Sequence, residues 1–174
     1  NDSLGVYVKK QLSTDWLMRV DVSTTSLRYR DFRNDQQPTA GDGSGRSGTM
    51  TGEQRAIKWS SLWQANAQTI VNFGVDSQHD TYVSEGDNSY DTKRTQRTLQ
   101  GFFTGLNRQW DRLSLQLNAR HDNLKVVSED FSGIETENIT SSNTGLLGLG
   151  WRLTPQWRLT SAVSSGFKAP TAYD

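Results

Sequence analysis

Apolar and polar residues alternate along most of this 174-residue chain. A period of two is typical of a β-strand whose two faces meet different environments. Leu113, Leu115 and Leu117, for example, alternate with serine, glutamine and asparagine. The longest strongly apolar runs span two or three residues, whereas a membrane-spanning helix needs about 20. The pattern therefore excludes a helical membrane protein and predicts an all-β chain of about eight strands, the clearest of them over 16–22, 57–64, 71–76, 113–120, 147–153 and 157–164.

The connections between these strands alternate in length. Short links are expected at 13–15, 65–67, 111–112 and 154–156, and long ones over about 33–52, 81–95 and 123–143. In an antiparallel up-and-down sheet this alternation places every short turn at one end and every long loop at the other. Several long loops rich in glycine, serine and aspartate are unusual in a compact soluble domain but normal in an outer-membrane barrel.

Tryptophan marks the short turns. Trp16, Trp63, Trp110 and Trp157 each lie beside one of them, and each follows the one before by 47 residues. This spacing indicates one hairpin per repeat. Because tryptophan anchors proteins at the boundary between water and hydrocarbon, the four rings predict a membrane interface at the short-turn end.

An apolar-out, polar-in transmembrane barrel explains these features together, since backbone groups pair between strands and polar side chains line the lumen. The alternative is a soluble sandwich or lipocalin-like barrel, in which the apolar face would point inward. Leu27 and Tyr29 are out of phase with 16–22, which predicts a β-bulge at 23–26. For Phe102 and Phe103 either face is open. The charged residues expected on the lumen face are Arg19, Lys58, Asp76, Arg120, Arg152 and Arg158.

No sequence motif for catalysis, nucleotide binding or zinc binding occurs, so we expect no enzyme, no cofactor and no metal centre. Nineteen basic residues balance 19 acidic ones without blocks of charge, which argues against a nucleic-acid partner. His79 and His121 are expected to be polar rim residues. The segment 85–91 offers oxygen ligands for calcium, but it lacks EF-hand spacing, and a solvated acidic loop is the preferred interpretation. The same holds for Glu129, Asp130, Glu135 and Glu137.

Residues 164–174 read Ser-Ser-Gly-Phe-Lys-Ala-Pro-Thr-Ala-Tyr-Asp. This run resembles the strand-to-loop motif of TonB-dependent outer-membrane receptors. The segments 106–122, 150–153 and 157–159 are similar to hairpins of the same family. Their order and spacing most resemble its cobalamin (vitamin B12) receptor branch, and the resemblance covers essentially all 174 residues.

The resemblance implies a plugged barrel of about 22 strands in the bacterial outer membrane, of which residues 1–174 form about eight. The plug domain, the segment that contacts the TonB complex and the remaining strands would lie outside this chain. The implied function is active uptake of a small-molecule nutrient, namely a corrinoid. The alternative ligand is an iron chelate, either a ferric siderophore or haem. An autonomous eight-stranded barrel acting as an anchor or adhesin is a different possibility, and a secreted soluble β-protein is another.

Ligand contacts are expected at the loop tips and on the outer part of the lumen face. Aromatic rings and groups that form hydrogen bonds are the side chains suited to this role. The candidates are Tyr82, Tyr90, Phe131, Lys168 and Tyr173.

Overall fold

The computed structural model describes residues 1–32, 46–86, 94–130 and 132–166. They form a single antiparallel sheet whose strands follow one another in sequence order. Its strands are β1 (Asp2–Ser13), β2 (Trp16–Phe32), β3 (Arg46–Asn66), β4 (Thr69–Gly86), β5 (Arg94–Gln109), β6 (Leu113–Glu129), β7 (Glu135–Arg152) and β8 (Arg158–Ser164).

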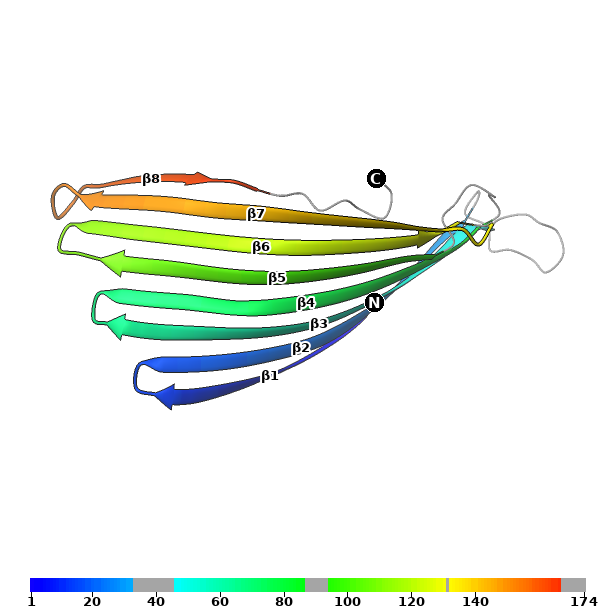
Figure 1. Cartoon of the computed structure of the whole chain (residues 1–174), viewed down its shortest axis with the longest axis horizontal. Coiled ribbons are helices and arrows are strands. Elements are labelled where there is room, and N and C mark those ends of the chain that lie inside the picture. Colours follow the sequence, from blue (N-terminus) through cyan, green and yellow to red (C-terminus); the bar gives the residue numbers. More distant parts are fainter. Residues whose placement is uncertain (33–45, 87–93, 131, 167–174) are drawn as a thin grey trace.

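The up-and-down topology predicted from the connections is confirmed. Each strand pairs antiparallel with the next one in the chain. Figure 1 shows the turns β1–β2, β3–β4, β5–β6 and β7–β8 together at one end of the sheet. We call this the short-turn end and the opposite one the outer end. Trp16 and Trp63 lie at the short-turn end, as predicted, and the structure shows in addition that they are direct cross-strand partners.

The strands are longer than the alternation indicated. β4 continues to Gly86, and the expected loop over 123–143 is mostly strand, because β6 runs to Glu129 and β7 begins at Glu135. In these outer extensions polar and apolar side chains no longer keep to separate faces, since Leu124 and Val126 lie on the polar face and Lys125 on the apolar one, although the backbone stays paired. Our loop boundaries were wrong for this reason.

The predicted bulge at 23–26 is also wrong. The register between β2 and β3 is continuous from Trp16 opposite Trp63 to Asp31 opposite Gly48. Leu27 and Tyr29 therefore lie on the polar face of the sheet. The open question on β5 is answered by register, since Phe102 is opposite Val75 on the apolar face and Phe103 is opposite Gly74 on the polar one.

The apolar side chains are exposed, which is the reverse of a soluble core. Val22, Ile57 and Phe102 are each 51% exposed, and Leu124 is the one buried hydrophobic side chain in the described part of the chain. The polar face, in contrast, buries Asp80 and Asp122. Because side chains crowd on the inner side of a curved sheet, this indicates a sheet that curves with its polar face inward. The lipid-facing interpretation of the apolar face is favoured over a soluble barrel.

The sheet is open. Within the described ranges β1 pairs with β2 and β8 with β7, and Figure 1 places β1 and β8 at opposite sides. The eight strands thus do not close into a small autonomous barrel. No helix among the described residues is long and apolar enough to cross a membrane.

Candidate functional site on the polar face

Charges of alternating sign cross the polar face in one transverse row. Asp21, Lys58 and Asp76 are successive register partners on β2, β3 and β4. The row continues through Gly101 on β5 to Asp122 on β6. The guanidinium of Arg120 lies over Gly101 and supplies the missing positive charge. We call Asp21, Lys58, Asp76, Arg120 and Asp122 the charge belt.

Arg120 is the centre of the charge belt. Its two terminal nitrogens donate to the two carboxylate oxygens of Asp76, each at 2.8 Å. Its Nε donates to Asp122 at 2.9 Å. A Cβ atom on Gly101 would lie 2.7 Å from Arg120 Cζ and 2.8 Å from Asp122 Oδ1, so only glycine leaves room for this arrangement.

Aromatic rings support the cations beside the belt. Lys58 Nζ lies 4.9 Å from the centre of the Phe103 ring. Arg19 Cζ lies 4.4 Å from the centre of the Tyr7 ring, while Arg19 Nε donates to Asp21 at 2.8 Å. Such cation–π contacts stabilise a cation that lies over the face of an aromatic ring. The expected polar-face positions of Arg19, Lys58, Asp76 and Arg120 are confirmed by register.

Closer to the outer end, Asp80 is fully enclosed at 1% exposure. Its Oδ1 accepts hydrogen bonds from Gln54 at 3.1 Å and from Gln78 at 3.0 Å. Its Oδ2 accepts one from Arg97 Nε at 2.9 Å. A buried carboxylate is tolerated only with such partners, so the Asp80 cluster ties β3, β4 and β5 together.

One step further out, β2, β3 and β4 carry an apolar and aromatic patch within this polar face. Leu27 is opposite Gly52, and Gly52 is opposite Tyr82. A Cβ on Gly52 would lie 3.1 Å from the Tyr82 ring and 3.6 Å from Leu27 Cβ, so the glycine lets both side chains approach across β3. Tyr29 follows two residues beyond Leu27 on the same face and is 59% exposed. We call Leu27, Tyr29 and Tyr82 the outer patch.

The outer patch contains one of the five predicted ligand-contact residues, Tyr82. The other four, Tyr90, Phe131, Lys168 and Tyr173, lie outside the described residues. Leu27 and Tyr29 were not among the candidates. Their signal was already visible as two apolar residues out of phase with the rest of their strand, but we had interpreted it as a bulge.

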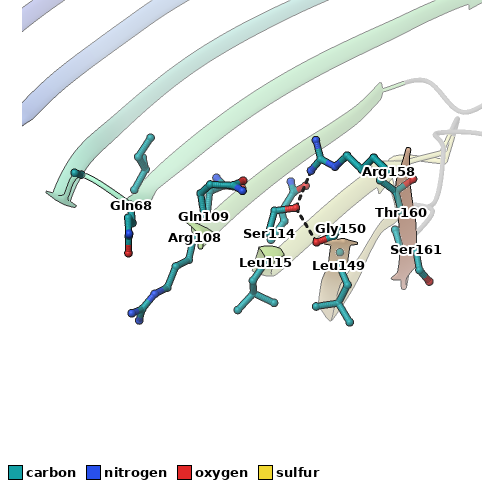
Figure 2. Close-up of a pocket in the computed structure, with 16 residues that line it drawn as sticks. Gln68, Arg108, Gln109, Ser114, Leu115, Leu149, Gly150, Arg158, Thr160 and Ser161 are labelled. Atoms are coloured by element: carbon teal, nitrogen blue, oxygen red, sulfur yellow. Dashed lines mark hydrogen bonds between the residues drawn. The ribbon is translucent and has the colours of Figure 1, made fainter. Parts of the chain in front are cut away.

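A groove of about 510 Å³ lies at the short-turn end, lined from β4 to β8 (Figure 2). Within it Arg158 Nη2 donates to Ser114 Oγ at 2.7 Å across β7. Ser114 Oγ in turn lies 3.4 Å from the carbonyl oxygen of Gly150. These contacts place Arg158 on the polar face, as predicted.

Among the described side chains no group of three or more histidine, aspartate or glutamate residues could hold a metal ion. Most of the calcium candidate 85–91 lies outside the described residues. Asp130 instead holds a turn, because its Oδ1 accepts the backbone N–H groups of Ser132 at 2.8 Å and Ile134 at 2.9 Å. His121 lies on the apolar face, where its Nδ1 is 2.8 Å from Asn143 Oδ1.

An antiparallel up-and-down sheet with an apolar outer face and a polar inner face is the pattern of the wall of an outer-membrane β-barrel, and the open sheet corresponds to part of such a wall. The sequence matches the family described as TonB dependent receptor-like, beta-barrel over residues 1–174. The chain belongs to this family, which confirms the resemblance seen in the sequence. It is therefore part of a bacterial outer-membrane protein, and its family is one of receptors rather than enzymes.

The curated relatives include the vitamin B12 transporter BtuB of Vibrio cholerae serotype O1, 22% identical over 99% of this chain. The chain spans about a quarter of the length of that relative. One similar solved structure is the apoprotein of the FrpB iron transporter from Neisseria meningitidis, with a TM-score of 0.71 and 14% identity, and the match covers 97% of this chain and 29% of that one. Another is the unliganded ferric citrate transporter FecA, with a TM-score of 0.67 and 10% identity, and the match covers 93% of this chain and 26% of that one. These structures show that the fold is shared.

Proposed function

We propose that the complete protein containing this chain is a TonB-dependent active transporter that takes up a corrinoid across the outer membrane. The observation that carries the proposal is the similarity to the vitamin B12 transporter, which extends over 99% of this chain. The energy for uptake would come from the TonB complex, contacted by a segment outside residues 1–174. A plug domain and the remaining strands of the barrel would lie outside the chain as well.

The outer patch supports a role in ligand capture. Tyr82 lies at the outer end of β4, on the face that a closed barrel would turn to its lumen. Leu27 and Tyr29 are exposed beside it, at 38% and 59%. Aromatic rings with a polar edge suit a large ligand that has both apolar surface and hydrogen-bonding groups. We propose that Tyr82 contacts the ligand, together with Tyr90, Phe131, Lys168 and Tyr173.

The charge belt and the Asp80 cluster stabilise the part of the polar face that lies below the outer patch. Asp76 and Asp80 accept hydrogen bonds from arginines on other strands. Asp21 and Asp122 accept them from arginines on their own strands. Each carboxylate below the outer patch is thus held by a cation. Preorganised binding surfaces lose less conformational entropy when the ligand arrives. A ligand at the outer patch would therefore bind to a surface that needs little rearrangement.

Uptake of labelled cyanocobalamin by cells with and without the complete gene tests the proposal. Loss of energy-dependent uptake on deletion is the expected result. Unchanged cyanocobalamin uptake, together with reduced uptake of a ferric siderophore or haem, would overturn the corrinoid assignment and leave the transporter class intact. Unchanged uptake of all three would overturn the transport function itself.

A further inference from the structure

The apolar face has a hollow of about 400 Å³ near its outer boundary on β1 to β4. Its apolar lining comes from Leu4, Val6, Val22 and Ile57, which are each more than half exposed. Arg55 and His79 lie at its outer end. The hollow thus combines an aliphatic surface with two nitrogen-rich side chains on one side.

The strand register shows an ordered change of charge at this boundary. One transverse row, which we call the border row, contains only basic titratable groups: Arg55, His79 and Lys125. The next row outward contains only acidic ones: Asp2, Glu53 and Glu137. The complete border row is Leu4, Thr24, Arg55, His79, Thr98, Lys125 and Ile139, and the row beyond it is Asp2, Ser26, Glu53, Thr81, Gln96, Val127 and Glu137.

This order fits a layer of phosphate groups. The two rows are separated by two residues along each strand, which corresponds to about 7 Å. Lipid phosphates lie just outside the hydrocarbon and attract arginine and lysine, while carboxylates beside them would be repelled. Cations next to the apolar surface, with carboxylates one step further away, are therefore the charge pattern expected where lipid headgroups are bound.

Arg55 still has donors for such a headgroup. Its Nε and Nη2 each lie 2.7 Å from Glu53 Oε1, in an ion pair whose side chains are 71% and 49% exposed. A guanidinium has five N–H donors, so those on Nη1 are not used by this pair. His79 is the register partner of Arg55. Its Nδ1 lies 3.0 Å from Thr98 Oγ1, and its Nε2 has, among the described residues, one long contact of 3.5 Å with Thr81 Oγ1.

We propose that this hollow binds a lipid of the outer leaflet that carries phosphate on its headgroup. One acyl chain lies along Val6, Val22 and Ile57, and the phosphate accepts hydrogen bonds from Arg55 and His79. The site is on the outer surface of the barrel wall, opposite the polar face, and does not depend on which nutrient the protein carries.

The test uses the complete protein, purified in detergent and incubated with lipid A or with the same glycolipid after removal of its phosphates. Lipid that remains bound is counted by native mass spectrometry. We expect the phosphorylated form to be retained and Arg55→Gln to weaken its binding about fivefold, with a similar loss for His79→Gln. Equal binding of both glycolipids, or unchanged binding by Arg55→Gln, would overturn the phosphate contact.

Lys125→Gln is the matched control. Lys125 belongs to the same border row and forms a comparable ion pair, at 2.8 Å with Glu137, but it lies on β6, away from the hollow. Its substitution should leave lipid binding unchanged, and an equal loss would show a general charge effect instead of a site. Binding of inorganic phosphate alone with the same dependence on Arg55 would overturn the lipid assignment.

The acyl chain is tested separately by Val22→Trp, which fills the hollow without changing charge. We expect lost lipid retention, whereas Val75→Trp on the same face but outside the hollow should retain it. Circular dichroism of each variant verifies that the barrel is folded. Full retention by folded Val22→Trp would contradict the proposed chain position.

Discussion

Arg120 on β6 and Asp76 on β4 form a two-point ion pair across the intervening strand, with both nitrogen–oxygen distances at 2.8 Å. The two residues are 44 positions apart in the sequence. They meet because β5 places a glycine, Gly101, between them. The charge belt thus depends on a residue that contributes no side chain.

Gly101→Ala should destabilise the protein. The new methyl group would overlap the Arg120 guanidinium and the Asp122 carboxylate, and overpacking of this kind costs about 1–3 kcal/mol. The free energy of unfolding, measured with urea on the complete protein folded in lipid vesicles, gives the size of the effect. Gly5→Ala is the control, because the nearest atom to its new Cβ would be 3.8 Å away. Equal stability of the two variants would contradict this account of Gly101.

Asp80→Asn should also lower the stability. The substitution leaves Arg97 beside a neutral group and turns one acceptor into a donor that faces the amides of Gln54 and Gln78. Asp80 is buried but Arg97 is 23% exposed, so we expect a loss of about 2 kcal/mol, less than for a fully buried pair. The same urea titration measures it.

The control for Asp80 is Asp111→Asn. Asp111 is 98% exposed and 3.9 Å from its partner Arg112, and exposed pairs of this kind add little stability. Its unfolding curve should coincide with that of the wild type. A similarly small effect for Asp80→Asn would mean that the Asp80 cluster does not hold the strands together.

Tyr82→Ala should weaken ligand binding about fivefold or more, because it removes the aromatic ring of the outer patch. Gly52→Ala should cause a smaller loss, since its Cβ would come within 3.1 Å of the Tyr82 ring and displace it. Equilibrium binding of cyanocobalamin to the purified complete protein measures both. Phe102→Ala removes a ring from the opposite face and should leave the dissociation constant unchanged. Wild-type affinity in Tyr82→Ala would exclude this side chain from the binding site.

Trp63 and Trp59 should report different depths in the membrane. Both lie on the apolar face of β3, four residues or about 13 Å apart, with Trp63 nearer the short turn. In single-tryptophan variants, lipids brominated near the headgroup should quench Trp63 more strongly. Lipids brominated deep in the acyl chain should quench Trp59 more strongly. The reverse order would contradict the interface position of the short-turn end.

The ligand-binding candidates show which features of the binding surface a local sequence pattern can predict and which it cannot. Tyr82 was predicted as an aromatic residue of a long outer loop, whereas the structure places it on β4, across Gly52 from Leu27. Leu27 and Tyr29 broke the alternation of their strand, but the sequence alone could not distinguish a bulge from an apolar patch on a polar face. That distinction depends on hydrogen bonding to β1 and β3, which is not a local property.

The sequence alone determined the all-β class, the strand order, most of the residues that share the apolar face and the short-turn end, because these depend on alternation and on spacing along the chain. The burial of the polar face then favoured an outward-facing apolar surface. Tertiary structure decided the lengths of the outer strands, since their pairing continues where hydrophobicity no longer alternates. It also decided which side chains meet. Register between strands brings together Arg120 with Asp76 and Arg97 with Asp80. It also places Arg55 beside His79 in the border row. Register depends on turn geometry and on how the apolar faces of two paired strands match, so these contacts are properties of strand pairs and not of any single segment.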